Sequence, residues 1–360
     1  MSTAAKRLAT RAIVTAIACM TGAGAASAQE YKLRYSDLGP PRGSRPQAMM
    51  WWADELKKRS EGRIEVEIFW SQALVKAEET QKAVGSGLVD TGTILGLYTP
   101  ADLPVWNLAN APFGGRDVWV GMRTWQDLRK STPALQKEAA KKNVKILANH
   151  TTGSVDILSR GTPILTAADL EGKKIRATGG WGALLKNLGA TPVRVGFGEV
   201  YQALDKGTVD ATINYIPAVR AYKHYEVADH ITEVQMGQVL GFGMGINLRT
   251  FNGMPKDLQD ILLEVSDEYV EVAARLFIEQ VEKYRKELVD GIDGKKIAFH
   301  QMDEAERSKW REAGSVFVED WIAKVEKKNI DGKKIVADLN QLRAKYEEEL
   351  ATKGYPWARK

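Results

Sequence analysis

The order of strands and helices constrains this chain most, because one rhythm occurs twice. Residues 31–35 and 64–69 alternate apolar and polar side chains, as half-buried strands do, and apolar residues at helical spacing lie between them. The same succession of strands and helices begins again after residue 155. Alternating strands and helices are typical of open α/β sheets, so the repeat predicts two α/β lobes.

Three segments are expected to connect these lobes. Residues 151–154 mark a crossing point, and the glycine-rich run 237–247 predicts a strand that crosses back. Pro255 opens an apolar pattern that continues to about residue 289, which predicts a long helix that braces both lobes. The expected fold class is α/β, with a mixed sheet flanked by helices in each lobe.

These connections set the expected limits of the domains. The expected parts are a signal peptide (1–28), lobe I (29–152 with about 240–285), lobe II (153–239 with about 290–335) and a C-terminal helix and tail (about 336–360).

The first residues have the composition of an export signal. Lys6, Arg7 and Arg11 form a positive segment. Residues 12–25 are small and apolar, and the sequence Ala-Ser-Ala that ends at Ala28 fits a cleavage site. This pattern predicts a secretory signal peptide, export to the periplasm and cleavage near Ala28.

Charge and cysteine content exclude several classes of function. The formal charge is +5, and loss of the three basic residues of the signal would leave about +2, so nucleic acid is not an expected partner. Cys19, the only cysteine, lies within the expected signal, so the mature chain would have no disulfide and no thiolate nucleophile. We expect the exported chain to act as a monomer.

Sequence motifs of catalysis are missing. The chain has no G-x-S-x-G, no Walker A sequence, no H-E-x-x-H and no G-x-G-x-x-G that opens a helix. Its four histidines show no metal-ligand spacing, and His224 and His230 are expected at the surface or in capping positions. These patterns favour a protein without catalytic residues, cofactor or metal.

Arg176 is the strongest candidate for a binding residue. It ends an expected strand, and ligands of α/β sheets bind outside the carboxyl ends of strands. Thr178, Gly179 and Gly180 follow it, and glycine would let the backbone approach a ligand. Arginine pairs with carboxylates in a bidentate geometry. The alternative is a surface arginine paired with a local acid such as Glu171.

Aromatic residues at strand-to-helix junctions are candidates for a pocket, because pockets are largely apolar with a few polar groups. Tyr98, Trp181, Phe197 and Tyr215 lie at such places and would favour an aromatic or branched carboxylate over a small aliphatic acid. Packing of the hinge is the alternative role for some of them. Asn214 ends another expected strand, where it would either shape the turn or bind the ligand.

Several sequence blocks resemble one family. The blocks DLEGKKIR (169–176), LGATPV (188–193) and EVYQALDKGTVD (199–210) resemble, in order and spacing, the extracytoplasmic solute-binding proteins of TRAP transporters, of the DctP type. The resemblance extends over the whole mature chain. It implies the two-lobed fold of periplasmic binding proteins, closing on a small organic acid that is handed to the membrane subunits of a TRAP permease.

The resemblance also implies roles for individual residues. Arg176 would pair with the ligand carboxylate, Phe197 would line the pocket and Asn214 would contact the ligand. Many members carry a second arginine where this chain has Thr162, and Arg160 is the nearest replacement. The branch with a metal-bridged ligand differs from this chain at residues 213 and 214, so no metal is implied. A binding protein of the ABC type and a secreted α/β enzyme are the alternative classes.

Overall fold

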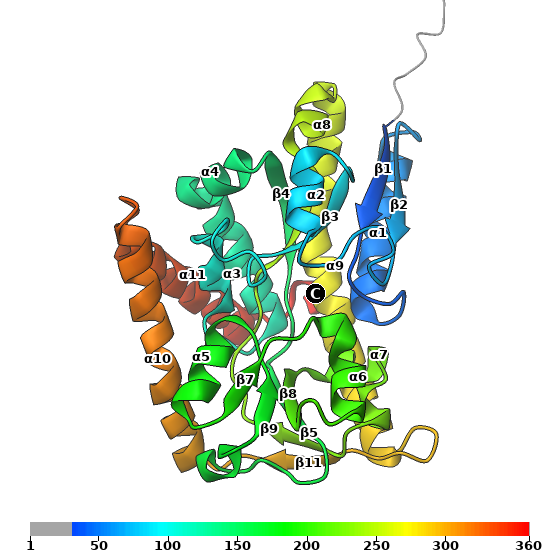
Figure 1. Ribbon diagram of the computed structural model, residues 1–360. Helices are drawn as coiled ribbons and strands as arrows, with labels where there is room; N and C mark the ends of the chain where they lie inside the picture. Colours follow the sequence, from blue (N-terminus) through cyan, green and yellow to red (C-terminus); the bar gives the residue numbers. More distant parts are fainter. Residues whose placement is uncertain (1–30, 360) are drawn as a thin grey trace, which may run out of the picture.

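Two mixed β-sheets form the frame of the molecule (Figure 1). The computed structural model describes residues 31–359, so the expected signal peptide and its cleavage site lie outside the described residues. The first sheet has the order β2-β1-β3-β10-β4, with β1 parallel to β2 and β3, and β10 antiparallel to β3 and β4. Its strands are β1 (Tyr31–Ser36), β2 (Ile64–Phe69), β3 (Thr91–Leu95), β4 (Val144–His150) and β10 (Phe242–Asn247).

The second sheet has the order β11-β9-β5-β8-β6-β7. Strands β6, β7 and β8 run parallel to one another, while β5 is antiparallel to both β8 and β9. Its strands are β5 (Asp156–Ser159), β6 (Lys174–Arg176), β7 (Thr191–Val193), β8 (Ala211–Asn214), β9 (His230–Glu233) and β11 (Ala298–Gln301). We call the first sheet with the helices packed on it lobe I, and the second sheet with its helices lobe II.

Helices cover both sheets and join them. They are α1 (Ser44–Arg59), α2 (Thr80–Ser86), α3 (Val118–Ser131), α4 (Pro133–Lys141), α5 (Gly179–Asn187), α6 (Val200–Asp205), α7 (Ile216–Ala221), α8 (Leu248–Gly253), α9 (Lys256–Asp290), α10 (Glu304–Glu326) and α11 (Gly332–Lys353), with short 3-10 turns η1 (Trp106–Asn110), η2 (Ala167–Leu170), η3 (Phe197–Glu199), η4 (His224–Glu226) and η5 (Pro356–Ala358). The expected α/β fold with two lobes is confirmed.

Two crossings between strands connect the lobes, as expected, and α9 makes a third connection between β10 and β11. One runs from β4 to β5 and the other from β9 to β10. The crossings hydrogen-bond to each other: the amide of Thr152 donates to the carbonyl of Val239 (3.2 Å), and the amide of Val155 donates to the carbonyl of Gly237 (2.8 Å). Paired crossings of this kind confine relative motion of the lobes to a narrow hinge.

Helix α9 braces the hinge, and Figure 1 shows it running from one lobe to the other. It packs on α1, α3 and β4 of lobe I and on α7 of lobe II. At the lobe II end the guanidinium of Arg285 donates two hydrogen bonds to the Glu233 carboxylate, of 2.5 and 2.8 Å. Helix α10 also contacts both lobes, since it packs on α5 while Trp321 donates to the carbonyl of Pro104 (2.8 Å).

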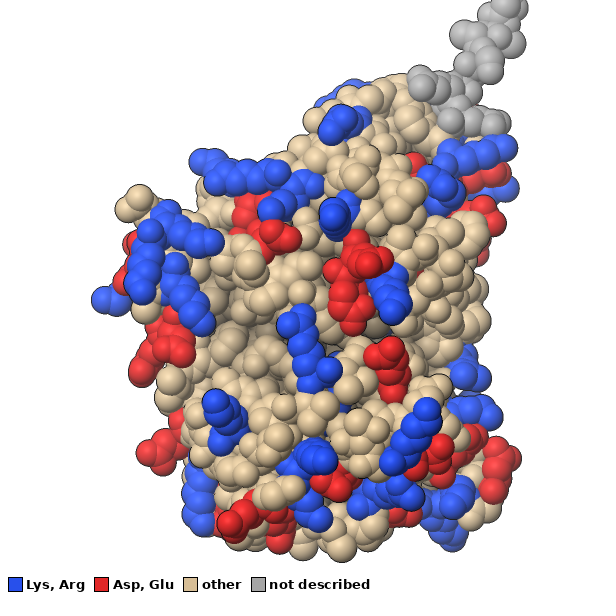
Figure 2. All heavy atoms as spheres, in the orientation of Figure 1, with Lys and Arg blue, Asp and Glu red and all other residues tan. Residues whose placement is uncertain are grey.

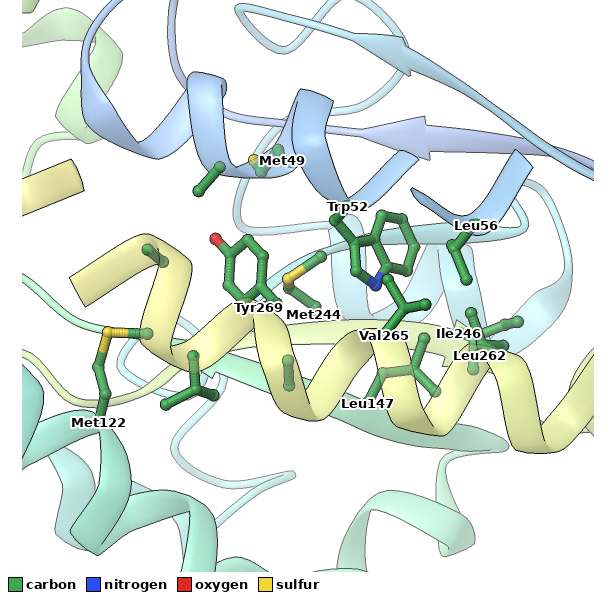
Figure 3. Packing of buried hydrophobic residues seen from close by; sticks show 14 of the residues in the cluster. Met49, Trp52, Leu56, Met122, Leu147, Met244, Ile246, Leu262, Val265 and Tyr269 are labelled. Carbon is green, nitrogen blue, oxygen red and sulfur yellow. The ribbon is translucent and has the colours of Figure 1, made fainter. Parts of the chain in front are cut away.

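The core of lobe I is built around the contact between α1 and α9. Figure 3 shows Trp52 of α1 packed over Leu262 and Val265 of α9, above Ile246 of β10. The indole of Trp52 is fully buried, and its N–H donates to the hydroxyl of Ser266 (3.0 Å). This position therefore combines apolar burial with a satisfied polar group.

Replacing Trp52 by alanine is expected to lower the free energy of unfolding by about 3–5 kcal/mol, because a large cavity opens in the core. Urea unfolding of the purified protein measures this change. Met50→Ala is the control on the same helix: Met50 is 44% exposed, so its truncation should change stability by less than about 0.5 kcal/mol. Equal losses for the two variants would contradict this account of the core.

Candidate ligand-binding site

A cavity lies between the lobes, at the carboxyl ends of strands from both sheets. Leu38 and Tyr98 follow β1 and β3 of lobe I, while Arg176 and Tyr215 lie at the ends of β6 and β8 of lobe II. Its other apolar lining residues include Leu95, Leu97, Val155, Trp181, Phe197, Ile213, Pro217, Ala218, Tyr222, Val239, Phe242 and Phe277. The carboxyl ends of strands at the junction of two α/β units are where ligands of such folds bind.

The cavity is small. The volume open to the centre of a water molecule is about 70 Å³. Each water needs roughly 10–15 Å³ of such volume, so the space holds about five waters, or one organic molecule of similar size. A mainly aromatic and aliphatic wall provides few partners for a ligand with many hydroxyl groups.

Arg176 is a buried charged group in this wall, and it has no counterion. Its side chain is buried, with the residue only 3% exposed. Its Nε donates to the carbonyl of Val195 (2.9 Å), and its guanidinium carbon lies 5.1 Å from the centre of the Phe197 ring. Among residues 31–359, no carboxylate forms an ion pair with it within 4.0 Å. The guanidinium is thus held in place but not neutralised.

The electrostatics of Arg176 follow from this burial. Burial lowers the pKa of Arg176, and the nearby side chains of Tyr98, Glu78 and Tyr215 oppose that shift only in part. Arginine nevertheless keeps its proton in proteins, so the cavity wall contains a desolvated positive charge. A desolvated charge without a partner costs several kcal/mol, and a bound anion would offset this cost.

The four predicted aromatic residues all line the cavity. Tyr98 and Phe197 meet across the cleft, because the Phe197 amide donates to the Tyr98 hydroxyl (3.3 Å). Phe197 also stacks on Tyr215, with ring centres 6.1 Å apart. Trp181 is fully buried and its indole N–H donates to the carbonyl of Met236 (3.2 Å), so it supplies apolar surface only. Burial raises the pKa of Tyr215 to about 12, which keeps its hydroxyl protonated.

Asn214 does not line the cavity; it holds His224. Its amide lies 2.9 Å from Nδ1 of His224, and its Oδ1 accepts from the amide of Tyr215 (2.9 Å). His224 is fully buried and its ring lies 5.8 Å from that of Phe197. The expectation that His224 lies at the surface was therefore wrong, because a short polar stretch does not reveal that η4 packs inward.

Arg160 lies outside the cavity. It is exposed in the turn after β5, and its Nη1 donates to the carbonyls of Leu204 and Asp205 (2.9 Å each) at the end of α6. Thr162 is exposed in the same turn. The structure thus does not place Arg160 where a second cationic ligand contact would be, since capping of a helix terminus occupies its guanidinium.

Gly180, the second glycine after Arg176, has a packing role. A Cβ on Gly180 would lie 2.8 Å from Cδ of Pro112 and 3.0 Å from the carbonyl oxygen of Asn110. Gly180 therefore allows α5 to pack directly against the segment that follows η1.

The sequence analysis missed a second arginine in the cavity. Arg45, in the first turn of α1, lines the cavity from lobe I and forms a buried ion pair with Asp37. Nothing in the sequence around Arg45 distinguishes it from an ordinary residue at the start of a helix. Only the turn at 39–43, which returns α1 to the end of β1, brings the two side chains together.

Contacts between the lobes close the cavity. Arg42 of lobe I donates from Nε to the carbonyl of Ala221 in lobe II (2.5 Å). Arg194 of lobe II donates from Nη2 to the carbonyl of Tyr98 in lobe I (3.4 Å). A ligand between the lobes would therefore be enclosed by both.

Other kinds of site have no support in the part of the chain that the structure describes. No group of three or more histidine, cysteine, aspartate or glutamate side chains there is arranged to hold a metal ion. Within residues 31–359, no helix is long and apolar enough to cross a membrane. Positive and negative side chains are interspersed on the face drawn in Figure 2.

Comparison with known proteins identifies the family. The sequence model of the bacterial extracellular solute-binding proteins, family 7 (DctP), matches residues 38–324, and the chain belongs to this family. It is a solute receptor, not an enzyme, and its family is extracytoplasmic. The family that the sequence blocks predicted is confirmed.

Two relatives illustrate the similarity in sequence. The C4-dicarboxylate-binding periplasmic protein DctP of Rhodobacter capsulatus is 27% identical over 297 residues, which are 80% of this chain and 85% of that protein. The 2,3-diketo-L-gulonate-binding periplasmic protein YiaO of Escherichia coli is 29% identical over 244 residues, 66% of this chain and 71% of that protein.

Solved structures share the fold. A TRAP periplasmic solute-binding protein from Bordetella bronchiseptica, with bound (R)- and (S)-mandelate, has a TM-score of 0.77 at 24% identity, covering 88% of this chain and 99% of that one. A TRAP solute-binding protein from Rhodoferax ferrireducens, in complex with benzoate, has a TM-score of 0.76 at 21% identity, covering 88% and 98%.

The buried environment of His224 has a measurable consequence. Burial, with a smaller contribution from the charge of Arg176, lowers the pKa of His224 to about 3. Below about pH 6.5 this histidine is therefore protonated in the unfolded chain but stays neutral in the folded protein, so the free energy of unfolding falls as the pH drops from 6.5 towards 3. Between pH 7 and 5 this histidine alone should cost about 2 kcal/mol.

Urea unfolding of the wild type and of His224→Gln at both pH values measures this effect. The comparison between the two proteins is needed because Asp156 and Glu138, whose pKa values burial raises to about 7, change stability in the opposite direction. The loss from pH 7 to 5 should be about 2 kcal/mol smaller in the variant. Identical pH dependence in both proteins would show that His224 is solvated.

Proposed function

We propose that this protein is an exported receptor that binds a small carboxylic acid with an apolar, ring-like body and delivers it to the membrane subunits of a TRAP permease. The observation that carries the proposal is Arg176: a buried guanidinium without a carboxylate partner, in the wall of an apolar cavity between two lobes. A ligand carboxylate would accept hydrogen bonds from its Nη atoms and neutralise it.

The binding mechanism follows from the position of Arg176 between the lobes. Arg176, Phe197 and Tyr215 belong to lobe II, while Leu38 and Tyr98 belong to lobe I, so only the closed arrangement surrounds a ligand. The ligand stabilises closure by its higher affinity for that state. The permease would then distinguish loaded from empty receptor by the relative position of the lobes.

The apolar wall supports a ring acid over a sugar acid. Trp181, Phe197 and Phe242 offer rings and no free hydrogen-bonding group to the cavity, and burying ligand hydroxyls there without partners costs free energy. The solved relatives with benzoate and with mandelate are consistent with this ligand class, whereas a relative from Chromohalobacter salexigens was solved with D-glucuronate.

The remaining parts of the proposal concern the exported chain. We infer cleavage near Ala28, because of the basic, apolar and small-residue pattern of residues 1–28, and action in the periplasm. We also infer that the receptor is a monomer and that it does not bind nucleic acid; the interspersed charges on the face drawn in Figure 2 support the second inference.

Thermal unfolding with a panel of acids tests the ligand class. Benzoate, phenylacetate or mandelate at about 100 times its dissociation constant should raise the melting temperature by roughly 4 °C. Glucuronate should give no shift, because its several hydroxyl groups would find few partners in this small and mainly apolar cavity. Stabilisation by succinate or malate alone would refute the preference for a ring.

Calorimetric titration of an Arg176→Gln variant with the acid that stabilises best tests the anchor. Loss of the charge-assisted bidentate contact should weaken binding at least about 100-fold. Arg160→Gln is the matched control, since the same substitution lies outside the cavity and should leave affinity unchanged. Unaltered binding by Arg176→Gln would remove the basis of the proposal.

A further inference from the structure

The charges around the cavity carry information about the charge of the ligand. Two arginines with buried guanidinium groups line it from opposite lobes, Arg176 from lobe II and Arg45 from lobe I. A pocket with two free guanidinium groups would suit a dicarboxylate. Only one of the two is free here, and the difference lies in Asp37.

Asp37 holds Arg45 in a closed ion pair. Nη1 and Nη2 of Arg45 donate to the two different oxygens of the Asp37 carboxylate, the second over 2.6 Å, so the contact is bidentate. The Asp37 side chain is 0% exposed and that of Arg45 is 13% exposed. Because this bidentate ion pair is shielded from solvent, water does not replace either partner, and the net charge of the pair is zero.

Further donors fix the Asp37 carboxylate in this position. The hydroxyl of Thr93 donates to Oδ2 (2.7 Å) and the amide of Gly39 donates to Oδ1 (2.8 Å). The hydroxyls of Thr93 and Tyr35 are in turn 2.9 Å apart, in the core of lobe I. With four donors on its two oxygens, the carboxylate has all its hydrogen bonds made. Separation of Arg45 from Asp37 would therefore cost free energy, because it would disturb this hydrogen-bond network.

The other basic groups of the wall add no fixed buried charge. His150 is buried, and burial, followed by the charge of Arg45, lowers its pKa to about 3, so its ring is neutral at neutral pH. Arg42 is exposed to solvent and donates to the carbonyl of Ala221. The buried wall therefore presents one uncompensated positive charge, that of Arg176.

We propose that Asp37 is a specificity-determining residue: by neutralising Arg45 it restricts the cavity to acids with a single carboxylate and excludes dicarboxylates. A second carboxylate of a ligand would be desolvated in the cavity without a cation to pair with, which is costly. The inference rests on the proposed function, since it assumes that Arg176 holds the first carboxylate.

The test compares two ligands of equal size and different charge. Succinate and succinamate differ only in one carboxylate, which is an amide in succinamate, and titration calorimetry is done at a pH where all carboxyl groups are ionised. The wild type should bind succinamate at least about tenfold more tightly than succinate. In Asp37→Asn, which frees the charge of Arg45, the ratio should shift towards succinate at least about tenfold.

The double variant Asp37→Asn/Arg45→Met is the control, because it removes the freed charge and should return the ratio to that of the wild type. Retained benzoate binding shows that each variant is folded. A ratio in Asp37→Asn that shows no gain for succinate overturns the inference, and so does a gain that persists in the double variant.

Failure of this inference is distinguishable from failure of the proposed function. If benzoate binding depends on Arg176 but the wild type binds succinate and succinamate with equal affinity, the role of Asp37 is overturned and the proposed receptor function stands. Absence of binding of every acid by the wild type overturns both.

Discussion

A desolvated guanidinium without a counterion is the constraint on which the rest of the structure depends. Arg176 is buried at the end of β6, and its hydrogen bond to the carbonyl of Val195 fixes its direction without neutralising it. Two other buried arginines have carboxylate partners: Arg307 pairs with Glu304, and Arg45 with Asp37. Buried Arg129 also lacks a carboxylate, but its guanidinium donates to the carbonyls of Ile146 and Leu147 in the core of lobe I. Arg176 differs from Arg129 in its place: it lies in the wall of the cavity where the lobes meet, which is the position for a ligand that couples binding to closure.

The frame around Arg176 limits how the lobes can move. Two crossings, paired through Thr152 and Val239, act as the hinge, and α9 contacts both lobes along its length. A hinge of this kind permits closure around a ligand while the two sheets stay intact. Contacts such as that between Tyr98 and Phe197 form only when the lobes approach, so they belong to the same closure.

The sequence predicted the frame better than the site. Strands with clear alternation, such as β1 and β2, and the long helix α9 were found with limits within a few residues. Strands β9 and β11 were missed, because four residues of mixed polarity carry no periodic signal. Arg176 and the four aromatic residues lie in the cavity wall because strand ends converge there by topology.

The residues whose surroundings the sequence did not predict share one physical reason. The positions of Arg160, Asn214 and His224 were predicted from their neighbours in the sequence, but they depend on tertiary contacts. Arg160 caps the end of a helix, and Asn214 and His224 contact each other. Arg45 was missed for the same reason, since its ion pair with Asp37 spans a turn whose path the sequence does not reveal. Whether a charged residue is free or neutralised is a property of the folded protein, and here it decides what the cavity can bind.

A crystal structure of the protein grown with its tightest-binding acid tests the central claim most directly. The account predicts one carboxylate on the Nη atoms of Arg176, with the ring against Phe197 and Trp181 and the Arg45–Asp37 pair intact. A carboxylate bound to Arg45, or a ligand outside the cavity between the lobes, would contradict it.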